Sequence, residues 1–170
     1  MPTDSRKGPP ADGSSEAARL AELARAVRRS TLERLAAVPP GGENLAVGAG
    51  AMSAADVAQH LIDADVWLER KLRRPDLSAM RGRAGTVWID RRAEWDRLLD
   101  QLERSGRRRE ELLLALNSEE LDRRLPDERF GGEASVWWIV VRGNLEHEAH
   151  HRGQIAAGLR MAAERLSEAS

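Results

Sequence analysis

Four stretches of the chain carry apolar residues every three or four positions, which is the spacing of an amphipathic helix. The pattern predicts helices over residues 16–38, 53–74, 86–117 and 135–166. Pro39-Pro40-Gly41-Gly42 ends the first helix and Pro75 ends the second. Ser53 provides an N-cap for the second, with Asp56 as an acidic partner three residues later. No segment alternates with period two for long enough to predict a strand.

Residues 75–85 are predicted to be a loop, Thr86 to cap the third helix and Gly106 to weaken its middle. Residues 118–124 are predicted to form a short extra turn. Residues 1–14, rich in Pro, Gly and Ser, are expected to be a disordered tail. Residues 15–167 then form one domain, an all-α four-helix bundle.

The net charge of the chain is too small to attract nucleic acid or an acidic membrane by long-range electrostatics. The 27 Lys and Arg residues nearly match the 28 Asp and Glu residues, for a net charge of −1. The arginine runs at 107–109 and 123–124 stand among acids, as on solvated helix faces, so no nucleic-acid partner is expected. No apolar run could span a membrane, and the N-terminus lacks the apolar segment of a secretory signal, so a soluble cytoplasmic protein is expected.

The histidines carry the candidate chemistry. On the fourth helix His147 and His151 lie one turn apart, along the edge of the apolar stripe. His150 lies about 100° around the helix from His151, toward solvent, and is not expected to be a ligand. His60 lies on the edge of the stripe of the second helix. If the two edges meet, three neutral imidazoles form a metal site with an open position; separate histidines, hydrogen-bonded to their neighbours, are an equal alternative on spacing alone.

Two other metal sites fit less well. His147-Glu148-Ala149-His150-His151 matches the H-E-x-x-H motif of metallopeptidases, but no histidine follows it and no sheet edge is predicted to hold a peptide. A di-iron bundle needs two Glu-x-x-His motifs, and only Glu148 with His151 forms one. A bundle in which a metal has no catalytic role remains an alternative.

Two segments resemble the DinB/YfiT-like superfamily. Ser53-Ala-Ala-Asp-Val-Ala-Gln-His60-Leu resembles its first-histidine segment, and Glu146-His-Glu-Ala-His-His-Arg-Gly-Gln-Ile155 resembles its C-terminal HxxxHRGQ signature. The resemblance extends from about residue 16 to residue 165 in helix order and spacing. One departure is Met52, where many relatives carry Trp before the cap serine.

The resemblance implies a four-helix bundle with an unusual connection order, often a homodimer. Trp138, which the helical wheel places outside the apolar stripe, suits such an interface. The resemblance also implies a divalent metal, zinc or nickel, held by His60, His147 and His151. Characterised relatives conjugate or isomerise small electrophiles with a low-molecular-weight thiol such as bacillithiol, mycothiol or glutathione. Many members have no known activity, and some have lost the metal.

The expected function is therefore that of a thiol-dependent S-transferase or isomerase. The chain has no cysteine, so the thiol would have to arrive as a cosubstrate. A metal with three neutral histidine ligands keeps its positive charge and favours the thiolate. The same site could instead activate water, so a metal-dependent hydrolase is an alternative, as is a non-enzymatic metal-binding bundle.

Five further residues are candidates around the histidines. Glu148 and Arg152 are four residues apart and are expected to form an ion pair that stiffens the ligand helix. Alternatively, Glu148 is a catalytic base and Arg152 anchors an anionic substrate group. Asn144 could hydrogen-bond a ligand histidine or the substrate, and Asp63 could orient His60. Trp67 could wall the pocket, although a tryptophan at this spacing is more often part of the core.

Overall fold

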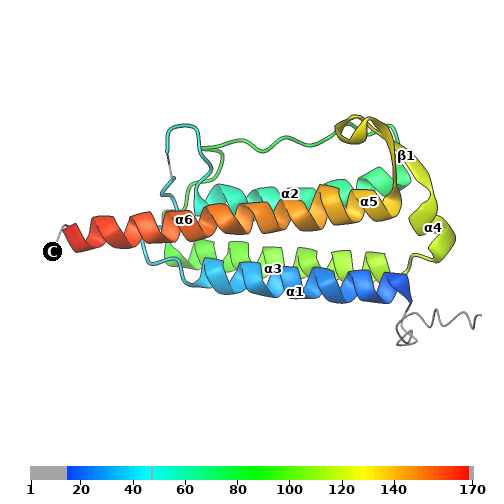
Figure 1. Cartoon of the computed structure of the whole chain (residues 1–170). Coiled ribbons are helices and arrows are strands. Elements are labelled where there is room, and N and C mark those ends of the chain that lie inside the picture. Colours follow the sequence, from blue (N-terminus) through cyan, green and yellow to red (C-terminus); the bar gives the residue numbers. More distant parts are fainter. Residues whose placement is uncertain (1–14, 47, 169–170) are drawn as a thin grey trace, which may run out of the picture.

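A computed structural model of the chain describes residues 15–46 and 48–168. Four long helical segments lie side by side (Figure 1), which confirms the predicted all-α four-helix bundle. The segments are α1 (Glu16–Ala36), α2 (Ala54–Arg73), α3 (Arg92–Leu114), and a last run of α5 (Val136–Val140), the π-helical turn η2 (Val141–Leu145) and α6 (Glu146–Glu168). The predicted tail, residues 1–14, lies outside the described residues.

The helices follow an unusual order of directions, as the resemblance implied. In Figure 1, α1 and α6 run one way along the bundle, and α2 and α3 both run the other way. Two consecutive parallel helices require a connection that returns along the full length of the bundle. Residues 74–91, here called the crossover segment, make this return. They pass close to His60, because a methyl group on Gly82 would lie 3.0 Å from Cε1 of that imidazole.

The third helix begins later than predicted, at Arg92 instead of Thr86. The carboxylate of Asp56 accepts hydrogen bonds from the backbone N–H groups of Gly85, Thr86 and Val87, at 2.8–3.0 Å. The side chain of Asn44 pairs with both backbone groups of Ile89. Since these side chains satisfy four backbone N–H groups and one carbonyl between residues 85 and 89, the segment stays extended and does not begin a helix.

Asp56 thus completes the capping box of the N-cap Ser53, as predicted, and also holds the crossover segment one helical turn from His60. Burial alone would raise the pKa of Asp56, but hydrogen bonds from Gly85, Ser53, Val87 and Thr86 outweigh it and lower the pKa to about 2. Because the folded pKa lies below the ordinary value of 3.8, the stabilisation is present above about pH 4 and is lost as the pH falls toward 2.

Replacing Asp56 with alanine is expected to lower the free energy of unfolding at pH 7 by about 2–4 kcal/mol, because several backbone donors lose their acceptor. Urea unfolding measures the loss, and hydrogen exchange should show faster exchange at residues 85–87. Asp63→Ala is the matched control on the same helix, since that carboxylate is exposed and accepts a bond only from Gln59 among the described contacts. Its expected effect is within about 0.5 kcal/mol. Equal losses in the two variants would contradict the fastening role of Asp56.

A small hairpin connects α3 to the last helical run. It follows the short helix α4 (Ser118–Asp122) and consists of β1 (Arg124–Asp127), the 3-10 turn η1 (Glu128–Phe130) and β2 (Gly132–Ser135), with Leu125 opposite Ala134. The extra turn was predicted, but the two strands were not. Strands of four residues are too short to show alternation, and Gly131 and Gly132, with φ of 81° and 115°, permit the turn between them.

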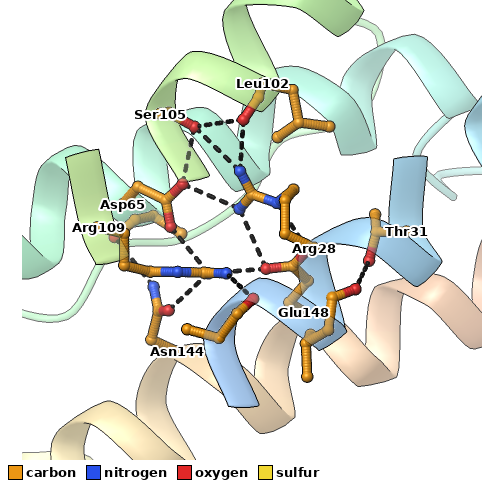
Figure 2. Close-up of polar contacts among 11 residues, drawn as sticks. Arg28, Thr31, Asp65, Leu102, Ser105, Arg109, Asn144 and Glu148 are labelled. Atoms are coloured by element: carbon orange, nitrogen blue, oxygen red, sulfur yellow. Dashed lines mark hydrogen bonds and ion pairs between the residues drawn. The ribbon is translucent and has the colours of Figure 1, made fainter. Parts of the chain in front are cut away.

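The core is divided along the bundle into two apolar clusters by a layer of buried polar side chains. One cluster holds the start of α1 with the ends of α2 and α3; the other holds the end of α1 with the starts of α2 and α3. We call the polar residues between them the charged layer (Figure 2). Its members come from all four helical segments and are Arg28, Asp65, Ser105, Arg109, Asn144 and Glu148.

Two surface features bear on partners. No helix in the described part of the chain is both long and apolar enough to cross a membrane. The side chain of Trp138 is 42% exposed; it stacks on Trp137 and meets the ring of Phe130 edge to face. A homodimer that covers Trp138 stays a prediction.

Candidate metal centre

Three histidine side chains converge between α2 and α6. Nε2 of His147 lies 3.1 Å from Nε2 of His60 and 3.0 Å from Nε2 of His151. One ligand nitrogen from each of the three lies within 4.8 Å of the others. His60 and His151 are buried and His147 is partly exposed, so the cluster reaches the surface at His147. The structure therefore brings together the three histidines that the sequence singled out.

The donor set fits a divalent metal. Tetrahedral zinc with Zn–N bonds of about 2.0–2.1 Å separates its nitrogens by roughly 3.3 Å, a few tenths more than the separations from His147. Nδ1 of His151 lies 2.8 Å from Oε1 of Gln154 and donates to it, which leaves a lone pair on Nε2 facing the other rings. Imidazole nitrogens are preferred ligands of both zinc and nickel. The residues can hold the ion that the resemblance implied.

The environment keeps these imidazoles neutral. Burial lowers the pKa of His147 to about 4, helped by the nearby charges of His151 and His60 when these are protonated. Burial also lowers the pKa of His151 to about 4, against the opposing effect of the hydrogen bond that His151 donates to Gln154, and lowers the pKa of His60. Because a metal binds only the neutral imidazole, little proton competition remains at pH 7.

The same shifts predict how the metal-free protein responds to acid. Unfolded histidines take up protons near pH 6.5, whereas His147 and His151 resist protonation to about pH 4. The free energy of unfolding should therefore fall as the pH is lowered from about 6.5 to 4, by at most about 3 kcal/mol for each histidine and by less for the partly exposed His147, because solvent screens its charge. Urea titrations in EDTA measure it. The double variant His147→Gln/His151→Gln should show a flatter profile, and parallel profiles would contradict the prediction.

Gln154 is a site residue that sequence reasoning missed. Its side chain bridges two histidines: Oε1 accepts from His151, and Nε2 lies 3.1 Å from Nε2 of His150 and donates to it. This places His150 outside the three converging nitrogens. The signal was present in the HRGQ segment, because a residue three positions after a helical histidine lies beside it. Gln154 fixes the tautomer of His151.

Glu148 lies in the charged layer and does not pair with Arg152 as predicted (Figure 2). Oε1 lies 2.8 Å from Nε of Arg28, and Oε2 lies 2.7 Å from Nη1 of Arg109. Burial alone would raise the pKa of Glu148, but Arg109 and Arg28 outweigh it and lower the pKa to about 2. A carboxylate this weakly basic and fully engaged by two guanidinium groups is a poor general base. The geometry instead favours the expectation that Glu148 stiffens the ligand helix, with two partners from α1 and α3.

None of the other candidates is a described hydrogen-bond partner of the three imidazoles. Asn144 accepts a hydrogen bond from Arg109 at 2.9 Å and belongs to the charged layer. Asp63 is exposed, and its described hydrogen bond comes from Gln59. Trp67 is buried in an apolar cluster and donates from Nε1 to a backbone carbonyl of the crossover segment, at Ser78. Arg152, one residue after His151, is partly exposed.

A second residue missed by the sequence reasoning is Arg129, in the turn of the hairpin. Its guanidinium lies over the ring of Trp67, 4.5 Å from the ring centroid, and is held by the carboxylate of Asp127. A methyl group on Gly143 would lie 2.9 Å from Nη2, so the guanidinium packs against the bare backbone one turn before His147. Its positive charge, after burial and the other histidines, adds to the lowering of the pKa of His147. No periodic pattern marks a residue in a three-residue turn.

Comparisons with known proteins agree with this architecture. A DinB-like protein (YjoA) from Bacillus subtilis superposes with a TM-score of 0.63 at 17% identity, over 85% of this chain and 92% of that one. YfiT from Bacillus subtilis, described as a probable metal-dependent hydrolase with an unusual four-helix bundle topology, superposes with a TM-score of 0.65 at 15% identity, over 92% of this chain and 94% of that one. No curated protein sequence matches this chain. The family model of the DinB superfamily matches residues 16–155, and the chain belongs to that superfamily.

Proposed function

We propose that this chain binds one divalent metal ion through His60, His147 and His151 and uses it to transfer a low-molecular-weight thiol to a small electrophile. The observation that carries the proposal is the convergence of three Nε2 atoms in a chain without cysteine. His60, His147 and His151 would hold the ion and leave room on it for a ligand from solution. The choice of a thiol for that ligand rests on the resemblance of the HRGQ segment to the signature of the DinB/YfiT-like superfamily.

The reaction needs a thiolate at neutral pH. A bound divalent cation favours the thiolate form of a thiol that it coordinates. The protein holds the three imidazoles neutral and oriented, with Gln154 fixing His151. The thiol proton passes to solvent, the sulfur forms a bond to the electrophilic carbon, and the leaving group departs with its electron pair. This substitution requires no protein base, which agrees with the engaged state of Glu148.

A metal-dependent hydrolase is the second candidate, because YfiT is described in those terms. Hydrolysis by an activated water usually draws on a nearby base. Among the carboxylates near the histidines, Glu148 is held by two arginines and Asp63 is turned to solvent. This arrangement favours thiol transfer over hydrolysis.

The test is a turnover assay on protein loaded with zinc or nickel. Glutathione, bacillithiol and mycothiol are each offered with 1-chloro-2,4-dinitrobenzene, and formation of the thioether is followed by absorbance. We expect turnover that requires both metal and thiol, and that His60→Ala abolishes together with metal binding. The exposed ion pair of Arg142 with Glu146 supplies a control, since Arg142→Gln should leave turnover unchanged.

Two results would contradict the proposal. Hydrolysis of p-nitrophenyl esters by the loaded protein without thiol, with no response to added thiols, would assign the hydrolase function. Stoichiometric metal with no turnover in either assay would favour a bundle in which the metal has no catalytic role.

A further inference from the structure

Arg129 is held in a fixed orientation beside the histidine cluster. The carboxylate of Asp127 accepts from Nε at 2.9 Å and from Nη2 at 2.7 Å, so that one edge of the guanidinium is fully used. The indole of Trp67 supports one face. Because the fork and the stacked ring together fix the plane of the group, little side-chain entropy remains to be lost when a ligand binds.

The guanidinium retains donors that Asp127 does not use. Of its five N–H groups, the carboxylate accepts from one on Nε and one on Nη2, which leaves both N–H groups of Nη1 and the second of Nη2. The side chain is 30% exposed, so these donors are reachable from solution. An unused edge of this kind matches the two oxygens of a second carboxylate.

The surrounding charges favour an anion at this place. Within the described structure, Asp65 and Glu148 are both neutralised in the charged layer by Arg28 and Arg109. Asp127 is committed to Arg129 itself. Asp63, exposed on α2, acts on His60 and has no described ion pair, so it offsets part of the positive charge. A divalent cation on three neutral imidazoles and the guanidinium of Arg129, whose charge acts on His147, would still repel each other. An anionic ligand that bridges them removes the repulsion.

We propose that Arg129 anchors a carboxylate group of the molecule whose sulfur occupies the open metal position, so that the cosubstrate is a thiol that carries a carboxylate. The inference rests on the proposed function and names the chemical class of the thiol. It also replaces Arg152 as the anion anchor: Arg129 has a fixed orientation and an unused edge, whereas Arg152 has no described ion pair to fix it.

The experiment measures ligand binding instead of turnover. Protein loaded with Co²⁺ is titrated with mercaptoacetate, 3-mercaptopropionate and 4-mercaptobutyrate and with their three amides, and the visible absorption of the cobalt reports each binding event. Matched acids and amides share length and sulfur and differ in the charge of the end group and in its second hydrogen-bond acceptor. We expect at least one length at which the acid binds about tenfold or more tightly than the amide, the size of one charge-assisted hydrogen-bonded contact.

Three variants test whether Arg129 causes the tighter binding of acids than of amides. Arg129→Gln should abolish it while leaving the amide affinity and the metal content unchanged, and Arg129→Lys, which keeps the charge but loses the fork, should retain part of it. Gly143→Ala should also reduce it, because its methyl group would lie 2.9 Å from Nη2 and displace the guanidinium. Arg142→Gln is the control on the same helical run and should bind acids and amides as the parent protein does.

The outcomes separate this inference from the function on which it rests. Equal binding of acids and amides, or a preference lost in Arg152→Gln but kept in Arg129→Gln, would overturn the inference and leave thiol binding intact. A parallel titration with acetate and propionate tests whether a carboxylate binds at Arg129 even if thiols do not bind the metal. If acetate or propionate shifts the cobalt spectrum of the parent protein but not of Arg129→Gln, and no thiol binds, the proposed thiol function is contradicted and the role of Arg129 as a carboxylate anchor is supported. If neither thiols nor carboxylates bind, both are wrong.

Discussion

Replacing His147 with alanine is expected to lower the affinity of the protein for zinc or nickel by about a hundredfold or more, because it removes the central nitrogen of the cluster. His150→Ala should leave the affinity essentially unchanged, since that imidazole contacts Gln154 outside the three converging nitrogens. Metal content after gel filtration and competition with a chromogenic chelator measure the two affinities. The two histidines belong to one helix and stand three residues apart, so that they form a matched pair.

Unfolding temperature gives an independent measure of the same effect. A ligand that binds only the folded state raises its stability by RT ln(1 + [L]/Kd). Zinc at a hundred times the Kd of the parent protein should therefore raise the stability of the parent by about 2.7 kcal/mol and that of His147→Ala by at most about 0.4 kcal/mol. Equal loss of metal from both alanine variants would show that His150 shares the ion and that the choice of ligands is wrong.

Replacing Arg109 with alanine is expected to lower the free energy of unfolding by about 3–5 kcal/mol, because two buried carboxylates would lose one of their two counterions. Arg107→Ala serves as the control on the same helix, since it breaks only an exposed pair with Glu103 and should cost less than about 1 kcal/mol. Urea unfolding at pH 7 compares the two. Losses of similar size would contradict a structural role for the charged layer.

The interaction energy between Arg109 and Asp65 tests the role of the charged layer more directly than the loss of stability in one single variant. Asp65→Leu also leaves an unbalanced buried charge, this time positive. The double variant Arg109→Ala/Asp65→Leu removes one charge of each sign, so its loss should be clearly smaller than the sum of the single losses. Strict additivity would mean that the two side chains do not interact in the folded protein.

The apolar periodicity was enough to predict the four helices. The positions of the histidines on two helical wheels, together with the first-histidine and HRGQ segments, were enough to single out the three histidines. The start of α3 was placed wrongly, because periodicity carries no information that Asp56 binds the backbone of residues 85–87 from another helix. The partner of Glu148 was missed for the same reason. Arg152 is near in sequence, whereas Arg28 and Arg109 reach Glu148 only through the packing of three helices.

The π-helical turn explains a further limit of sequence reasoning. A wheel drawn at about 100° per residue assumes an unbroken helix, and the N–H of Glu146 bonds instead to the carbonyl of Val141, five residues earlier. Positions before this turn are therefore rotated relative to those after it. Asn144, which the wheel placed beside His147, contacts Arg109 in the charged layer.

The charged layer has a consequence for how the helices can slide. Apolar side chains of similar size tolerate displacement of one helix past another, but a one-turn shift of about 5.4 Å would leave the carboxylates of Asp65 and Glu148 facing leucines instead of guanidinium groups. The charged layer thus fixes the axial position of α2 relative to α6. Asp65 is five residues from His60, and Glu148 adjoins His147. The charged layer therefore also fixes the position of His60 relative to His147 along the bundle axis.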